Sequence, residues 1–229
     1  MQFTHILMDL DGTVFDFDYA EKAAFKDLCR EYSIEYTEER YIFYQKVNDF
    51  RWKQLELGLI SKDEVMYNRF EEFLSVYGID GDSREMSRRF IELLVINTKP
   101  FDGAAETLKK LSERFVLDAS TNASLDIQQA KLKSAGMEGI FHKLFVSEDM
   151  GFPKPARQFF DFIFSYYKGV PKEEFLLVGD SPSADIKGAC DCGIKSVWVK
   201  NHKDYKGEAK PDFVIETLSD IENILREEK

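Results

Sequence analysis

Residues 6–13 read ILMDLDGT, in which an apolar stretch ends in two aspartates two positions apart and a glycine follows. The apolar character over residues 3–9 predicts a buried strand. Gly12 allows the chain to turn tightly directly after it. In open sheets of parallel strands, ligands bind at the carboxyl ends of the strands. The pattern therefore predicts that Asp9 and Asp11 lie in a site at this edge, the alternative being a turn that Asp11 merely caps.

The rest of the chain shows two different patterns. Between residues 15 and 96, apolar residues recur at spacings of three and four, which predicts a bundle of helices without strands. Beyond residue 99, short apolar runs alternate with helical patterns. The expected strands are 115–120, 143–146, 175–178, 196–199 and 213–215, and the expected helices are 104–112, 125–134, 156–167 and 183–192. This alternation is typical of a parallel, doubly wound sheet.

These patterns predict an α/β protein with two domains. Residues 1–14 and 97–229 are expected to form a doubly wound, Rossmann-like parallel sheet core. Residues 15–96 are expected to form an inserted all-α helical bundle, because this block follows the first strand directly. An insertion at that point predicts a cap domain over the carboxyl edge of the sheet.

Polar side chains also follow two other expected strands. Asp180 follows the strand 175–178 after one glycine, and Asp185 lies five residues further on, near the start of the next helix. Carboxylate oxygens at such a rim suit a hard cation, although Asp185 could instead be an acid that the helix dipole favours. Thr121 and Asn122 follow the expected strand 115–120, where hydroxyl and N–H groups suit phosphate oxygens. The same two residues also fit ordinary turn and N-cap chemistry.

The charges of these residues need a counterpart. Four aspartates brought together, Asp9, Asp11, Asp180 and Asp185, would repel one another strongly in a partly dry site. Lys154 stands between two prolines in a loop that this stiffens. One Mg²⁺ ion together with this lysine would offset three of the four negative charges. The sequence therefore predicts a bound divalent cation, Mg²⁺.

Composition excludes several classes of partner. With 42 acidic and 31 basic residues, the net charge of −11 disfavours nucleic-acid polymers and anionic membranes. The three cysteines do not suit a disulfide framework, and the three histidines do not have the spacing of a zinc site. Apolar runs are too short to span a bilayer, and the first residues do not resemble a signal peptide. We therefore expect a cytoplasmic protein, whose oligomeric state the sequence leaves open.

Taken in order, these elements resemble the haloacid dehalogenase superfamily over nearly the whole chain. The matching residues are Asp9, Asp11, Thr121, Lys154, Asp180 and Asp185. The insertion after the first motif is similar to the helical type-one cap of that superfamily. Dehalogenating members lack the second aspartate of the first motif, so Asp11 favours phosphoryl transfer. The chain departs from the pattern at Ala123, where glycine is usual, and Asp118 falls unexplained inside a strand expected to be apolar.

The resemblance implies a division of roles. Asp9 is expected to be the nucleophile and a Mg²⁺ ligand, together with the backbone carbonyl of Asp11 and the side chain of Asp180. Asp185 is expected to support the metal through water. Asp11 is expected to protonate the leaving group and then deprotonate the hydrolytic water. The groups assigned to the transferring phosphoryl group are Thr121, the Asn122 amide and Lys154.

A narrower resemblance concerns the substrate. Residues 44–52, 146–151 and 197–202 are similar to bacterial house-cleaning pyrimidine 5′-nucleotidases, which implies a nucleoside monophosphate as substrate. Within the expected cap, Asn48 could hydrogen-bond a base edge and Trp52 could stack on it. The alternative is equally compatible with the sequence: a solvated asparagine and a tryptophan in the core of the cap.

Two rival functions remain at this stage. A sugar-phosphate or phosphoglycolate phosphatase, or a phosphomutase, would use the same fold and the same nucleophile. A phosphate-sensing scaffold without activity would be expected to have lost a catalytic group, and the sequence retains them all.

Overall fold

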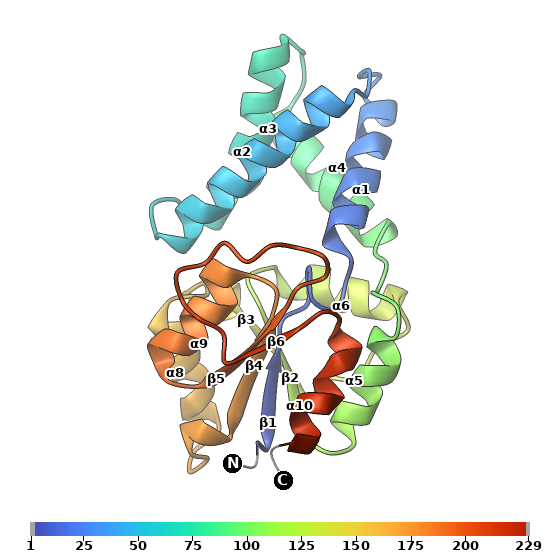
Figure 1. The fold of residues 1–229 in the computed structure, drawn as a ribbon. Coiled ribbons are helices and arrows are strands. Elements are labelled where there is room, and N and C mark those ends of the chain that lie inside the picture. The colour runs from blue at the N-terminus through green and yellow to red at the C-terminus, as the bar shows by residue number, and fades with distance from the viewer. Residues whose placement is uncertain (1–2, 228–229) are drawn as a thin grey trace. The chain divides into compact units, whose positions relative to one another are not determined.

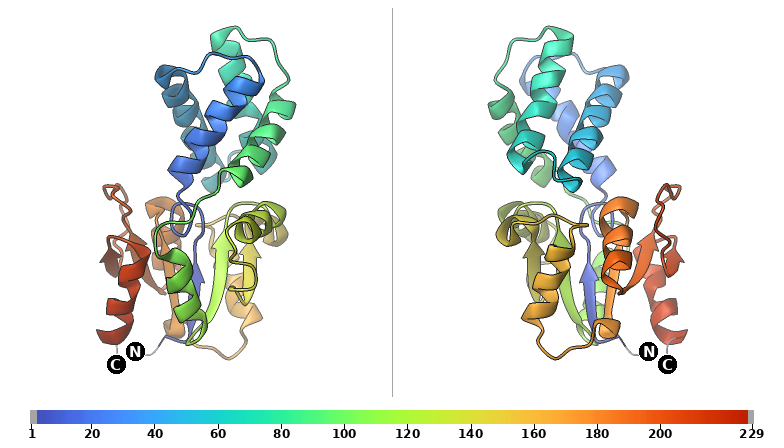
Figure 2. Two further views of the ribbon diagram at one scale, coloured as in Figure 1. Left: turned by 90° about the vertical axis from the view of Figure 1, so that its right-hand side faces the viewer. Right: turned by 90° about the vertical axis from the view of Figure 1, so that its left-hand side faces the viewer.

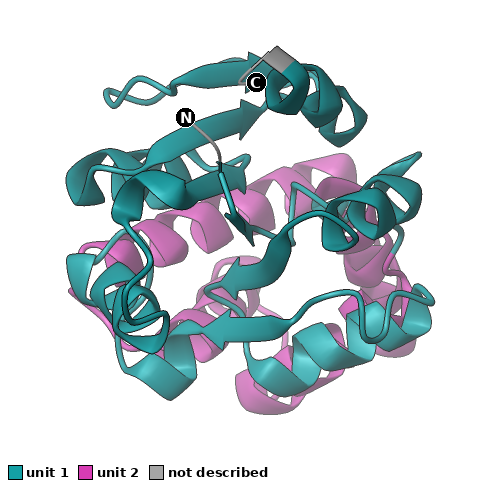
Figure 3. Cartoon of the chain, turned by 90° about the horizontal axis from the view of Figure 1, so that it is seen from below, with its two compact units in different colours: residues 1–17, 99–229 teal, residues 18–98 magenta. Residues whose placement is uncertain are grey.

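A computed structural model describes residues 3–227 of the chain. The chain divides into two compact units, which Figure 3 shows in different colours. The first, named the core unit, comprises residues 1–17 and 99–229, and the second, named the helical unit, comprises residues 18–98.

The core unit contains a six-stranded sheet in which every pairing is parallel. Its strands are β1 (His5–Met8), β2 (Val116–Thr121), β3 (Lys143–Val146), β4 (Phe175–Gly179), β5 (Lys195–Val199) and β6 (Phe213–Ile215). The spatial order is β3-β2-β1-β4-β5-β6, so the chain builds outward from β1 first on one side and then on the other. This confirms the predicted doubly wound sheet, and it places the reversal of strand order between β1 and β4, where such folds bind ligands.

Helices cover both faces of this sheet (Figures 1 and 2). One face carries α5 (Ala104–Ser112), α6 (Leu125–Ser134) and α10 (Ile221–Glu227), and the other carries α8 (Arg157–Tyr166) and α9 (Lys187–Cys192). The shorter elements are α7 (Ser147–Met150), the 3₁₀ turns η1 (Lys172–Glu174) and η3 (Leu218–Asp220), and the π-helical turn η2 (Pro182–Ile186).

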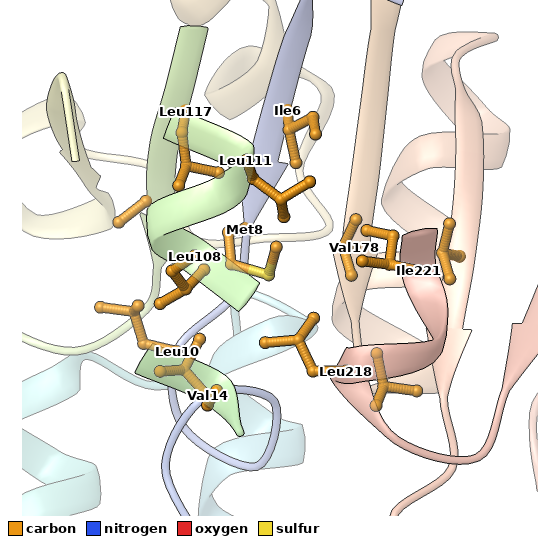
Figure 4. Close-up of a cluster of buried hydrophobic side chains, with 14 of the residues drawn as sticks. Ile6, Met8, Leu10, Val14, Leu108, Leu111, Leu117, Val178, Leu218 and Ile221 are labelled. Atoms are coloured by element: carbon orange, nitrogen blue, oxygen red, sulfur yellow. The ribbon is translucent and has the colours of Figure 1, made fainter. Parts of the chain in front are cut away.

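The alternation of side chains along β1 divides the apolar core into two clusters. Ile6 and Met8 lie in the cluster that includes Leu108 of α5 (Figure 4), whereas Leu7 lies in the cluster that includes Phe159 of α8. Successive residues of a strand point to opposite faces, so a short apolar run can fill both clusters. β1 is thereby fixed on both sides, and the residues that follow it are held at the edge of the sheet.

Asp118, which the sequence left unexplained, lies inside β2 and is completely buried. Its carboxylate accepts a hydrogen bond from the Tyr167 hydroxyl at 2.7 Å and contacts His142 Nδ1 at 3.2 Å. Burial raises the pKa of Asp118, and the hydrogen bonds from Tyr167 and His142 oppose this rise. A buried carboxylate is tolerated within the strand because it has these partners.

Ala123 also has a simple structural explanation. The non-glycine residues with positive φ among the described residues are Ser33, Asn201 and His202, so Ala123 needs no glycine-like backbone. Its N–H donates to the Thr121 hydroxyl at 3.0 Å. The departure from the family pattern therefore leaves the turn intact.

The helical unit is built from α1 (Phe17–Glu31), α2 (Glu38–Glu56), α3 (Lys62–Tyr77) and α4 (Ser83–Ile96). Local signals set the helix ends: Ser61 forms a capping box at the start of α3, and Gly78 ends this helix in a left-handed conformation. Stacked aromatic rings fill the interior, with Tyr44 4.8 Å from Phe25 and 5.3 Å from Phe70 between ring centroids. No helix within residues 3–227 is both long enough and apolar enough to cross a bilayer.

Candidate active site

Three aspartates meet at the carboxyl edge of the sheet. Asp9 follows β1 directly, and its N–H donates to the Val178 carbonyl of β4 at 2.8 Å. One carboxylate oxygen from each of Asp9, Asp180 and Asp185 lies within 4.8 Å of the other two. We call these three residues the carboxylate cluster.

Two glycines make room for this cluster. Gly12 has a φ of +92°, and a Cβ at this position would overlap the carboxylate of Asp180. A Cβ at Gly179 would likewise overlap the carboxylate of Asp185. A side chain at either position would therefore push a carboxylate out of place, and Gly12 also has a backbone conformation that other residues rarely adopt.

Lys154 is the cation buried among these carboxylates, with only 2% of its surface exposed. Its Nζ donates to Asp9 Oδ1 at 2.9 Å, to Asp185 Oδ1 at 2.7 Å and to the Ser120 carbonyl at 2.7 Å. All three ammonium protons are thereby used. Burial alone would lower the pKa of Lys154, but the carboxylates of Asp185 and Asp9 outweigh it and raise this pKa above its ordinary value.

The carboxylate cluster still carries more negative charge than Lys154 balances. Burial raises the pKa of Asp9 well above its ordinary value; Lys154 opposes this, and Asp185 and Asp180 add to it. Burial likewise raises the pKa of Asp180 to about 6, against the influence of Lys203. Crowded, partly dehydrated oxygen donors of this kind fit a hard divalent cation such as Mg²⁺, which would stabilise their ionised forms.

Thr121 lies at the end of β2 with its hydroxyl turned to accept hydrogen bonds. It accepts one from the Ala123 N–H at 3.0 Å and one from Gln128 Nε2 at 3.1 Å. In both bonds the hydroxyl is the acceptor, so its own proton can be donated to a phosphate oxygen.

The side chain of Asn122 bonds to the backbone of Lys154. Its amide Nδ2 donates to the Lys154 carbonyl at 3.0 Å, and its Oδ1 accepts from the Lys154 N–H at 2.8 Å. The side chain thus links the backbone of Lys154 to the end of β2. The sequence did not reveal this link, and the contact of the Asn122 amide with phosphate stays a prediction.

Asp11 does not join the carboxylate cluster. Its carboxylate accepts hydrogen bonds from two residues of α6, Gln128 Nε2 at 2.7 Å and Lys131 Nζ at 2.6 Å. Neither of these residues was singled out from the sequence, although they stand three positions apart on the helix that follows Thr121. That spacing places both on one face of the helix, which is the signal that could have found them.

β5 and the segment after it contribute further contacts that sequence reasoning missed. Lys203 Nζ lies 3.2 Å from Asp180 Oδ2, and Asn201 Nδ2 donates to the Gly12 carbonyl at 2.7 Å. Trp198 Nε1 donates to the backbone carbonyl of Asp180 at 2.9 Å. In the sequence, residues 197–202 show a resemblance to bacterial pyrimidine 5′-nucleotidases, which does not indicate these contacts.

Comparison with known proteins identifies the family. The family model for haloacid dehalogenase-like hydrolases matches residues 6–199, which include all the residues of the site described above except Asn201 and Lys203. The chain is a haloacid dehalogenase-like hydrolase.

Relatives of this hydrolase share its full length. YfnB of Bacillus subtilis, a protein assigned to the HAD-hydrolases, is 31% identical over 96% of this chain and 94% of its own. The pyrimidine 5′-nucleotidase PynA of Streptococcus pneumoniae is 32% identical over the same shares. The pyrimidine 5′-nucleotidase YjjG of Escherichia coli is 26% identical over 98% of this chain and 99% of its own. A crystal structure of YfnB bound to magnesium matches this fold with a TM-score of 0.94 and 30% identity, over 99% of this chain and 100% of that one.

In the helical unit of the hydrolase, Asn48 is buried and makes its hydrogen bonds within the protein. It is 2% exposed, and both ends of its amide are occupied: Nδ2 donates to Glu21 Oε1 at 2.9 Å, and Oδ1 accepts from Arg69 Nη1 at 2.9 Å. A direct hydrogen bond from Asn48 to a nucleobase does not follow from this arrangement. Trp52 is half-buried on α2, and its predicted stacking on a base stays a prediction.

Proposed function

We propose that this hydrolase is a Mg²⁺-dependent phosphomonoesterase in which Asp9 receives the phosphoryl group. The observation that carries the proposal is the surroundings of Asp9. Its carboxylate is bonded to the buried Lys154 and lies in the carboxylate cluster, while a second carboxylate, Asp11, stands two residues further on and outside that cluster. A nucleophilic carboxylate with a separate acid and base is the arrangement that an acyl-phosphate mechanism needs.

The proposed reaction has two steps. In the first, an Asp9 oxygen attacks phosphorus, the bond from phosphorus to the ester oxygen breaks, and the leaving oxygen takes a proton from Asp11. In the second, water attacks the phosphorus of the aspartyl phosphate and gives a proton to Asp11. The bond between phosphorus and Asp9 then breaks, which releases inorganic phosphate and restores both carboxyl groups to their starting forms.

Other groups of the site stabilise charge during these steps. Lys154 holds the attacking carboxylate, and the free proton of the Thr121 hydroxyl can be donated to a phosphate oxygen. The residues that would hold Mg²⁺ are Asp9, Asp180 and the Asp11 backbone carbonyl, with Asp185 acting through water. The ion would offset the negative charge of the phosphate and of the carboxylates when bound.

For the substrate, we propose pyrimidine nucleoside 5′-monophosphates. Two relatives that match nearly the whole chain are named pyrimidine 5′-nucleotidases, and this supports the proposal. Residues 15–96 would act as the cap that selects the leaving group, with Trp52 stacking on the base. The Trp52→Ala variant should lose its preference for pyrimidine over sugar phosphates, whereas Lys53→Ala, at an exposed neighbour, should keep it.

The test is phosphate release from a panel of phosphomonoesters, with Mg²⁺ and with the metal chelated. The panel contains uridine, thymidine and purine monophosphates, sugar phosphates and phosphoglycolate. The proposal predicts Mg²⁺-dependent turnover that is fastest on pyrimidine monophosphates. Fastest turnover on sugar phosphates would overturn the substrate class but keep Asp9, and no turnover of any ester would overturn the whole proposal.

A further inference from the structure

We propose that Gln128 and Lys131 are positioning residues that hold the carboxylate of Asp11 in place for proton transfer. This inference rests on the proposed phosphatase mechanism, in which Asp11 is the acid and base. Both residues belong to α6, which follows the turn after Thr121.

The first support is the geometry around Asp11. Lys131 Nζ donates to Oδ1 at 2.6 Å, and Gln128 Nε2 donates to Oδ2 at 2.7 Å, so each carboxylate oxygen has its own donor. Both donors come from one face of one helix, because positions i and i+3 of a helix are neighbours. Two donors on two oxygens fix the plane of a carboxylate as well as its position.

The second support is burial. Gln128 is fully buried and Lys131 is 3% exposed. Buried amide N–H and ammonium groups need partners, because leaving them without hydrogen bonds costs free energy. The ion pair that the structure describes for Lys131 is the one with Asp11, so this lysine is directed at the acid-base group and not at solvent.

The third support is the link that Gln128 makes within the site. The same Nε2 that donates to Asp11 also donates to Thr121 Oγ1 at 3.1 Å. With the amide turned round, its oxygen would face the carboxylate, so the hydrogen-bond pattern itself selects the orientation. Gln128 therefore connects the acid-base residue to the hydroxyl assigned to phosphate.

This arrangement leaves Asp11 able to react. A carboxylate has about four acceptor positions, and α6 takes two of them. The remaining positions are open to the proton that the leaving oxygen and the water exchange with Asp11. Without its two donors the carboxylate could rotate away from these reacting atoms, which slows proton transfer but leaves attack by Asp9 untouched.

Leaving groups of different basicity separate these two effects. A nucleoside 5′-alkoxide needs a proton to leave, whereas p-nitrophenolate is stable enough to leave without one. We expect Lys131→Met and Gln128→Met to lower kcat/KM for uridine monophosphate by roughly 10- to 100-fold. For p-nitrophenyl phosphate, kcat/KM of the Lys131→Met variant should change by less than about 3-fold, because kcat/KM covers the steps only up to the loss of p-nitrophenolate.

The second half-reaction gives an independent readout. Hydrolysis of the aspartyl phosphate needs Asp11 as base whatever the first leaving group was. With p-nitrophenyl phosphate, the Lys131→Met variant should therefore lower kcat and KM together by roughly 10-fold, and rapid mixing should show a burst of p-nitrophenolate. A residue with a merely structural role would not produce this split.

Two further variants act as controls. Lys131→Arg keeps a cationic donor and should recover at least about a third of the lost kcat/KM for uridine monophosphate. Lys133→Met, at an exposed lysine of the same helix, should leave all rates unchanged. Thermal unfolding of each variant shows whether it is folded at the assay temperature.

The outcomes distinguish failure of the positioning role from failure of the proposed phosphatase function. If folded Lys131→Met loses kcat/KM equally on both esters, or loses none on either, the positioning role is wrong. If the unmodified protein hydrolyses neither ester in Mg²⁺, the proposed phosphatase function itself is wrong.

Discussion

The carboxylate cluster of the core unit and the buried polar network of the helical unit differ in how their buried charges are balanced. In the helical unit, Glu21, Asn48 and Arg69 form a chain of hydrogen bonds in which one acid is matched with one base. In the core unit, Asp9 and Asp185 share the buried Lys154, and Asp180 pairs with the partly exposed Lys203, so three aspartates of the cluster meet two lysines. One set of charges is balanced by the chain itself, and the other is not.

The difference between these two networks indicates which part of the chain binds a ligand. A matched network holds helices in register and needs no ligand. An excess of buried negative charge is unfavourable unless a cation offsets it, so it is retained where a ligand binds. Burial is the first cause of the raised pKa values of Asp9 and Asp180, and neighbouring carboxylates of the cluster raise both further.

The largest expected effect follows from replacing the nucleophile. Asp9→Asn should lower kcat by at least about 10⁴-fold, because an amide cannot form the acyl phosphate. The fold should remain, since the change removes one charge from a crowded cluster. Steady-state assays and far-UV circular dichroism check both points, with Asp102→Asn, at an exposed aspartate of the core unit, as the control. Retained turnover would contradict the assignment of Asp9.

The next largest effect concerns the balance of charge in the core unit. Lys154→Met should lower the free energy of unfolding by about 3 to 5 kcal/mol in metal-free buffer, because two buried carboxylates lose their cation. Urea denaturation measures this loss. Combining it with Asp185→Asn should recover part of it, since one of those carboxylates is then neutral. Lys168→Met, at an exposed lysine, should change stability by less than about 0.5 kcal/mol.

The matched network of the helical unit predicts a pH dependence. Burial raises the pKa of Glu21 from 4.5 to about 7, so the folded state keeps its proton where the unfolded state has lost it. The stability that the folded state gains by binding this proton more tightly than the unfolded state is fully present below pH 4.5. It is lost as the pH rises to about 7. The loss is about 3 kcal/mol, at 1.36 kcal/mol for each pH unit.

Glu21→Gln tests this dependence, because glutamine resembles the protonated acid and does not titrate. The free energy of unfolding of the unmodified chain should fall relative to that of the variant between pH 4.5 and 7. Urea denaturation at several pH values measures the difference between the two proteins. Parallel curves for both would show that Glu21 is already ionised throughout.

The smallest of these effects separates structure from recognition at Asn48. Asn48→Ala should lower the free energy of unfolding by about 2 kcal/mol, because Glu21 and Arg69 each lose a hydrogen bond in a buried place. Relative kcat/KM values for uridine, purine and sugar phosphates should stay as they are. Lys46→Ala, at an exposed position of the same helix, is the control for stability. A changed preference among nucleotides without loss of stability would restore Asn48 as a contact to the base.

The sequence predicted what depends on local patterns. The strands 143–146 and 213–215 and the helices 104–112 and 125–134 have the predicted bounds, because apolar periodicity and turn residues act over a few positions. The carboxylate cluster was predictable as well, since the residues that follow parallel strands meet at one edge of the sheet. Its members Asp9, Asp180 and Asp185 do lie together in the structure.

What the sequence did not predict depends on contacts between distant positions. Asp118 accepts a hydrogen bond from Tyr167, 49 residues away, and Asp11 accepts one from Lys131, 120 residues away. Asn48 is buried because Glu21 and Arg69, 27 and 21 residues away, converge on it. Either partner alone looks like an ordinary polar residue, so the sequence does not show which distant residue it contacts.

The central claim is that Asp9 carries the phosphoryl group, and trapping that intermediate tests it most directly. Borohydride added during turnover of uridine monophosphate in Mg²⁺ reduces an aspartyl phosphate to homoserine, which peptide mass spectrometry locates in the chain. The account predicts homoserine at position 9, and none when Asp9→Asn is treated in the same way. Reduction at another carboxylate, or turnover without any reduction, would contradict it.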